Sequence, residues 1–202
     1  MIKKFLLLSI LNLFVISCTN KQMTNSPPPQ PLTEADKKTE LNISKTIAQE
    51  FAHNLKNELM NAVKMEGFVA AIPVCKQEAI PIGQQVSEIH SAQVSRVSLK
   101  ARNPENTPNV WQTKILQEFD QRAAAGEDIK TMGHAELIQN DGKQQLHFMK
   151  AIPTGSLCLA CHGTTLAPDI NAKLSKLYPE DKARGYSLNQ VRGAIVVVRD
   201  IN

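Results

Sequence analysis

Apolar residues recur at mostly helical spacing in the part of the chain that follows residue 33. The series is Leu41, Ile47, Phe51, Leu55, Leu59 and Val63, with charged residues between its members. Such a pattern is typical of a long amphipathic helix. Thr33 followed by Asp36 predicts its beginning, as a hydroxyl N-cap with a carboxylate three residues on, and Gly67 predicts its end.

Three further helical segments are expected. The first covers residues 68–88, carries Cys75, and should bend at Pro73 and Pro81, because proline removes a hydrogen-bond donor and clashes with the preceding turn. The second begins at the pair Thr107-Pro108 and ends at Gly126. The third is a short helix at residues 172–177.

Four segments are predicted as strands. Residues 94–101 are rich in β-branched side chains, and residues 192–201 end the chain with an apolar run. Residues 135–139 and 143–152 flank Asn140-Asp141-Gly142, and an Asp-Gly pair between two strand patterns is a strong hairpin signal. Hairpin-connected strands with helices before and between them predict an α+β fold: an antiparallel sheet with a long N-terminal helix and flanking helices.

The N-terminal segment is typical of an exported protein. Residues 1–17 place Lys3 and Lys4 before an apolar run too short to cross a bilayer, as in a signal peptide. The run ends in Val15-Ile16-Ser17-Cys18, which resembles a lipobox, so we expect cleavage before Cys18 and its lipidation, although an ordinary signal peptide with an incidental Cys18 is the alternative. Residues 18–33 would be a Pro-rich tether and residues 34–202 the folded domain, lipid-anchored on the periplasmic side of a bacterial membrane.

Charge and composition exclude one class of partner and suggest a cofactor. Lys and Arg number 23 against 19 Asp and Glu, a net charge of +4, which is too small for a nucleic-acid-binding protein. Aromatic residues are only 4% of the chain, so the core lacks large side chains. Another apolar group is expected to fill it.

The chemistry concentrates at Cys158-Leu159-Ala160-Cys161-His162, the C-x-x-C-H signature of covalent haem attachment. Two thiols on one short turn can reach the two vinyl groups of a porphyrin, and the adjacent His162 then lies under the iron. We therefore expect one haem c, bound through Cys158 and Cys161. Its burial would fill the core, and the chain without it should be poorly folded.

Three alternatives use the same cysteines differently. Cys75 could complete a zinc site of three cysteines and one histidine, although a second spaced pair of ligands is absent. Cys158 and Cys161 could be a thioredoxin-like dithiol, but the predicted context is not βαβ, or a structural disulfide formed after export. The dithiol and the disulfide leave His162 without a role.

Cys75 remains after Cys18, Cys158 and Cys161 have been assigned. It is either a buried, inert side chain or the sixth ligand of the haem iron. Met and His are the usual ligands in electron-transfer haems. The competing candidates are Met149, His147, Met132, His134 and His90.

Several longer segments resemble a family of exported single-haem c-type proteins with a PAS-like fold, whose domain is of unknown function. The resemblance covers residues 41–201. It is carried by the segments 71–75, 98–108, 158–163, 178–183 and 192–195, with Trp111, Gly185 and Tyr186. It implies thioether bonds at Cys158 and Cys161, His162 as one axial ligand and Cys75 as the other.

The family resemblance implies redox or gas sensing, or electron transfer. A thiolate ligand favours ferric iron, so reduction would weaken its bond, and release of Cys75 would open a position for CO or NO. The alternative is a low-potential electron carrier, and either role needs a redox or signalling protein partner. Arg96, Arg102 and Arg192 could bind the propionates, with Arg102 preferred. No catalytic motif predicts an enzyme.

Overall fold

The computed structural model describes residues 32–140 and 143–201. The described residues all belong to one compact unit. The predicted signal peptide, the lipidation site at Cys18 and the turn residues Asp141 and Gly142 lie outside the described residues. Among the described helices, none combines the length and the apolar character that a bilayer crossing requires.

Helix α1, Glu34–Ala71, begins as the sequence predicts. The Thr33 side chain accepts a hydrogen bond from the Asp36 N–H, and the Asp36 carboxylate accepts one from the Thr33 N–H, which completes a capping box. The helix is interrupted at Gly67, whose φ of 82° favours glycine, and continues for one more turn to Ala71. Gly67 therefore marks a kink instead of the end of the element.

The segment after α1 forms two helices where the sequence predicted one bent piece. Helix α2, Val74–Gln77, follows a break at Pro73, and helix α3, Ala79–His90, follows at once. Pro81 does not bend α3 because it is the third residue of that helix, where the backbone N–H has no helical partner to lose. Cys75 consequently lies on a four-residue helix of its own.

The sheet has four antiparallel strands in the order β1-β4-β3-β2. The predicted hairpin is present, and the sheet confirms the antiparallel α+β expectation. The strand bounds are β1 Gln93–Val97, β2 Gly133–Asn140, β3 Lys143–Pro153 and β4 Val191–Ile201. Strand β1 is shorter than predicted, because the hydrogen bonds of Ser98 go elsewhere. Its N–H donates to the Asn106 carbonyl, and its hydroxyl donates to the carbonyls of Arg192 and Lys100.

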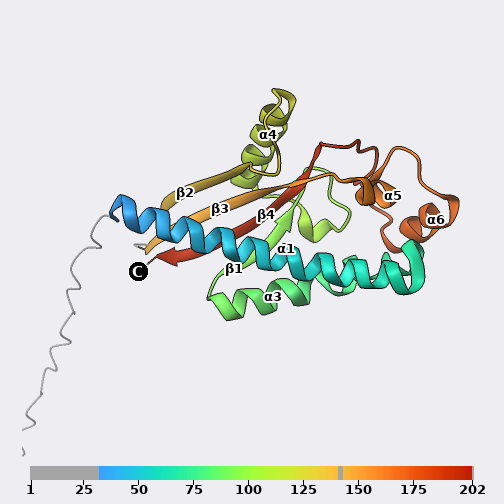
Figure 1. Ribbon diagram of the computed structural model, residues 1–202, viewed down its shortest axis with the longest axis horizontal. Helices are drawn as coiled ribbons and strands as arrows, with labels where there is room; N and C mark the ends of the chain where they lie inside the picture. Colours follow the sequence, from blue (N-terminus) through green and yellow to red (C-terminus); the bar gives the residue numbers. More distant parts are fainter. Residues whose placement is uncertain (1–31, 141–142, 202) are drawn as a thin grey trace, which may run out of the picture. The chain divides into compact units, whose positions relative to one another are not determined.

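Helices cover both faces of this sheet (Figure 1). On one face α1 and α3 pack through Phe51 and Val86 against Phe148 and Val197. On the other, α4, Val110–Ala124, packs through Phe119 against the neighbouring alternate positions of β3 and β4, Met149 and Val196. Helix α4 begins later than predicted: Asn109 forms its capping box with Gln112, while Thr107 caps the short 3-10 helix Pro104–Asn106.

The C-x-x-C-H segment lies beyond one end of the sheet (Figure 1). It spans the 3-10 helix η2, Ser156–Cys158, and helix α5, Leu159–His162, and is followed by α6, Pro168–Leu177, which begins before the predicted 172. A third apolar cluster joins α6 to the end of α1 through Ile72, Ile170, Leu174 and Tyr178, with Cys161 partly buried against it. The last turn of α1 is thus placed beside α5 and α6.

Candidate functional site

Cys158 and Cys161 lie on consecutive short helical turns, as the motif requires. The Cys158 N–H donates to the Gly155 carbonyl at 3.0 Å, and the Gly163 N–H closes α5 on Leu159 at 2.9 Å. Cys75, Cys158 and Cys161 are all free thiols and all partly buried. Both sulfurs of the motif are therefore available for a bond to another group, and the structural disulfide is not formed.

His162 is held by the segment that follows α6. Its Nδ1 lies 2.8 Å from the carbonyl oxygen of Ala183, and its own carbonyl accepts the Tyr186 N–H at 2.9 Å. Gly163 accepts in the same way from the Gly185 N–H at 3.0 Å. Because a carbonyl only accepts, Nδ1 carries the proton and Nε2 presents its lone pair. Histidines that bind a metal ion are commonly oriented in this way, by a hydrogen bond from the other ring nitrogen to a carbonyl or carboxylate.

His162 is neutral at every physiological pH. Burial lowers its pKa most, the positive charges of Arg192 and Arg102 lower it further, and the pKa falls from 6.5 to about 2. The hydrogen bond to Ala183 acts in the opposite direction but is outweighed. The Nε2 lone pair is therefore free to bind a metal ion instead of a proton.

Arg102 clamps the motif to the same segment. It is 8% exposed; its Nε donates to Asp181 at 3.1 Å, and its Nη2 donates to the carbonyls of Cys161 and Ala183. Burial raises the pKa of the Asp181 carboxyl, but hydrogen bonds from Arg102 and the Ala183 N–H outweigh this and hold it below its usual range. Arg102, predicted as a propionate partner, is thus occupied by protein groups.

Cys75 belongs to the same neighbourhood. Burial raises the pKa of the Cys161 thiol, Arg102 lowers it, and Cys75 and Cys158 raise it further, so the three sulfurs interact electrostatically. Cys75 also lines a cavity of about 400 Å³ together with Phe51, Gly83 and Arg96. The structure therefore brings Cys75, the C-x-x-C-H motif and two of the predicted arginines together at one end of the sheet.

The competing ligand candidates have other contacts. Met132 and Met149 are fully buried between the sheet and α4. His90 lies 2.7 Å from Glu50, the His147 ring stacks on Trp111 at 4.7 Å, and His134 lies 3.7 Å from Glu136. Their contacts among the described residues do not include the C-x-x-C-H segment.

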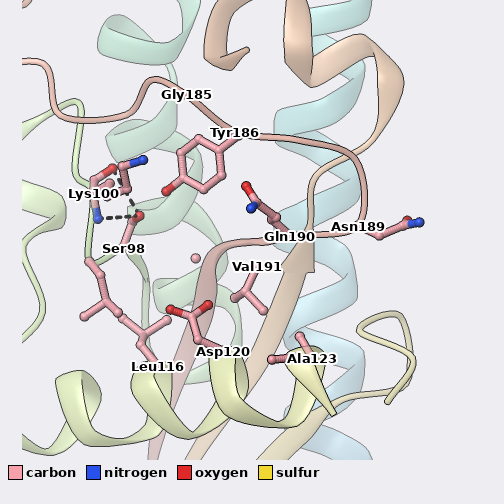
Figure 2. Close-up of a pocket in the computed structure, with 13 residues that line it drawn as sticks. Ser98, Lys100, Leu116, Asp120, Ala123, Gly185, Tyr186, Asn189, Gln190 and Val191 are labelled. Atoms are coloured by element: carbon pink, nitrogen blue, oxygen red, sulfur yellow. Dashed lines mark hydrogen bonds between the residues drawn. The ribbon is translucent and has the colours of Figure 1, made fainter. Parts of the chain in front are cut away.

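A second cavity, of about 410 Å³, borders the site through Tyr186. The Tyr186 ring meets the His162 ring edge to face at 6.2 Å, and Lys100 and Arg192 lie 4.6 and 5.2 Å from its centre. Figure 2 shows Tyr186 entering this cavity from the loop and Asp120 entering it from α4. Burial raises the pKa of Asp120.

The site contains residues that motif reasoning gave no role. Asp181, Ala183 and Tyr186 fall in segments that carry the family resemblance, but nothing local in the sequence indicates that they bind the motif. Tyr178 is 5% exposed, and its buried hydroxyl has no partner among the described residues. Burial and the nearby Cys75 raise the pKa of Tyr178 to about 12.

The geometry does not favour the alternatives to haem attachment. Within residues 32–140 and 143–201 no three His, Cys, Asp or Glu side chains are grouped as a metal-ligand set, so the zinc arrangement is not formed. The motif follows an antiparallel strand, β3, and not the parallel strand of a βαβ unit. A thioredoxin-like site has no structural basis here.

Comparison with known proteins gives two matches. The model of the Tll0287-like family matches residues 29–199. Among solved structures, the crystal structure of the cyanobacterial heme-protein Tll0287 is 20% identical and covers 85% of this chain and 98% of that chain, with a TM-score of 0.55. Because the two sequences are only 20% identical, the structural match is evidence for the fold alone. No curated protein matches the chain.

Proposed function

Because the chain belongs to the Tll0287-like family, whose namesake is a heme-protein, we propose that it binds one haem c and acts in redox or gas sensing. We also propose that the fold of this chain is PAS-like, as the family resemblance implies. We further propose that the protein is exported and anchored by a lipid on Cys18 on the periplasmic side of a bacterial membrane. The partner would be a redox or signalling protein.

Covalent attachment would use Cys158 and Cys161. Each thiol adds across one vinyl group, so that the sulfur bonds one carbon and the thiol hydrogen ends on the other, and no oxidant is consumed. Both thiols are free and sit one turn apart. When bound, the haem would supply the one-electron redox couple of its iron.

The observation that carries the proposal is the orientation of His162. Its Nδ1–H is fixed on the Ala183 carbonyl, which leaves a neutral Nε2 as a metal ligand next to two free thiols. Cys75 is proposed as the second axial ligand because it lines the adjoining cavity and interacts electrostatically with Cys161. A thiolate ligand stabilises ferric iron and so gives a low reduction potential.

Sensing is favoured over electron transfer by the unequal support of the two ligands. His162 is fixed by its own Nδ1 and carbonyl hydrogen bonds and by the Arg102 clamp. Cys75 lies on a four-residue helix that has no side-chain cap and is bounded by Pro73 and Glu78. Release of Cys75 on reduction would leave the His162 side of the site intact and open one position on the iron.

The attachment is tested by expressing the chain in a host that matures cytochromes c. We expect a pigment that stays with the polypeptide in acidic acetone and gives the haemochrome spectrum of haem c. Cys158→Ala and Cys161→Ala should each lose one thioether bond, while Cys75→Ala should keep both bonds and change the ferric spectrum. Colourless protein, or pigment extracted by acidic acetone, contradicts haem c.

The role is tested by adding CO to the reduced protein. A sensor that releases Cys75 on reduction binds CO readily. Cys75→Ala should then also bind CO, because no sulfur ligand has to leave the iron first. A wild-type protein that resists CO while Cys75→Ala binds it indicates the alternative, a low-potential electron carrier with two permanent ligands.

A further inference from the structure

The site carries more positive charge than its own carboxylates balance. Arg96, Arg102 and Arg192 all act electrostatically on His162. The carboxylate that pairs with arginines here is Asp181, which is 1% exposed. Its two oxygens are already taken, Oδ1 by Arg102 and Oδ2 by Arg184. Arg96 and Arg192 therefore remain without an acidic partner among the described residues.

Arg192, in β4, is partly buried. Its Nη1 donates to the Ser98 hydroxyl at 2.9 Å and to the Lys100 carbonyl at 3.5 Å, and its Nε is buried without a hydrogen-bond partner among the described residues. Burial lowers its pKa most; Tyr186 raises it, and Arg96 and Arg102 lower it further. Figure 2 shows Ser98 and Tyr186, the neighbours of this guanidinium, on the wall of the second cavity. A buried guanidinium with unused donors is costly unless an anion reaches it.

Arg96 faces the cavity that holds Cys75. It lies in β1 and makes no side-chain hydrogen bond or ion pair with another described residue. Glu88 and Glu105 line the same cavity, but neither carboxylate forms an ion pair with Arg96. Its guanidinium donors therefore remain available on the side of the site where Cys75 lies.

We propose that Arg96 and Arg192, and not Arg102, form a binding site for two carboxylates, and that these are the propionates of the haem. The inference rests on the proposed function, since haem is the group that would bring two carboxylates to His162. Guanidiniums bind carboxylates through paired N–H donors, which suits two arginines that have no carboxylate partner among the described residues. Arg102 then has a structural role: it ties Cys161 to Asp181 and Ala183.

The test compares Arg96→Gln and Arg192→Gln in the haem-loaded protein with Arg199→Gln as the matched control. Arg199 is also partly buried, but it pairs with Glu40 on α1 and takes no part in the site. Haem content per chain is measured first, and the midpoint potential is then followed as a function of pH.

In the wild type the arginines keep both propionates ionised, so the potential should be nearly constant near neutral pH. Each site variant should have a lower potential, because loss of a positive charge favours ferric iron. It should also gain an inflection above about pH 5, because a buried propionate without its arginine takes up a proton more readily. Arg199→Gln should match the wild type.

A potential lowered equally at all pH values, with no new inflection, shows a loss of charge without a propionate contact and overturns the inference. Site variants that behave like Arg199→Gln overturn it as well. If Arg192→Gln does not fold, Arg192→Lys is compared in the same way, because it keeps the charge but loses the paired donors. Wild-type protein without haem instead refutes the proposed function, and this is known before any variant is compared.

Discussion

His162 donates its Nδ1–H to the carbonyl oxygen of Ala183, 2.8 Å away and twenty-one residues further along the chain. This bond fixes the tautomer, and burial keeps the ring neutral. The ring is thereby oriented so that its Nε2 is free to bind a metal ion.

The first prediction concerns the pH dependence of stability. The pKa of His162 is lowered to about 2 in the folded chain, against about 6.5 when unfolded. Between these values the unfolded state binds more protons, so stability falls as pH is lowered below about 6.5, by up to about 1.4 kcal/mol per pH unit for one group. Urea unfolding at pH values from 7 down to 5 measures this.

His147 is the control for this experiment. Burial lowers its pKa too, although Glu136 acts in the opposite direction, so it contributes with the same sign. The slope that remains in His147→Gln belongs to His162. A His147→Gln protein whose stability does not change between pH 6.5 and 5 contradicts the burial of His162 described above.

The second prediction concerns Asp181. Asp181→Asn leaves the Arg102 guanidinium buried without its carboxylate, and breaking such a buried pair costs about 3–5 kcal/mol. Asp200→Asn, which removes an exposed partner of Lys143, should change stability far less, because solvent screens an exposed ion pair. Denaturant unfolding of the haem-loaded proteins compares the two.

The Asp181 carboxylate also predicts a stability change in acid. Because its pKa is held below the unfolded value, its contribution is present above about pH 3.9 and is lost as pH falls through the lower folded value. Asp181→Asn should therefore lose less stability than the wild type on acidification through this range. Identical acid profiles would contradict the clamp.

The third prediction concerns Tyr178. Its buried hydroxyl has no partner in the described part of the chain, and such a group costs about 1–3 kcal/mol. Tyr178→Phe removes only that oxygen and should leave stability unchanged or raise it, as judged from the unfolding midpoint. A loss of more than about 1 kcal/mol means that the hydroxyl has a partner in the loaded protein.

The fourth prediction concerns the approach of β1 to β4. Gly193 has a φ of 157°, and a Cβ there would lie 2.3 Å from the Val97 carbonyl oxygen. Gly193→Ala must separate the two strands beside Arg192, with a loss of about 3 kcal/mol or more. Gly155→Ala, where the Cβ meets nothing within 4 Å, should be tolerated. Thermal unfolding of the two variants distinguishes the positions, and equal midpoints would contradict the close approach.

Sequence alone determined what depends on residues close together in the chain. The Thr33–Asp36 capping box, the β2–β3 hairpin and the two adjacent thiols of the C-x-x-C-H motif are local, so their chemistry can be read from a few neighbouring residues. Local pattern was wrong at the Thr107 cap and at the Pro81 bend. There Asn109 offered the better cap, and the register of α3 placed Pro81 in its first turn.

Only the tertiary structure decided how the site is held and charged. Arg102 and Asp181 are seventy-nine residues apart, and nothing in their separate sequence contexts indicates that they pair. The sequence offered three arginines as propionate partners, and it led us to prefer Arg102, which the fold uses for other contacts. The fold distinguished them, because a buried arginine depends on the partners within its reach. Arg102 received a carboxylate and two carbonyls, while Arg96 and Arg192 have no acidic partner in the part of the chain that the structure describes.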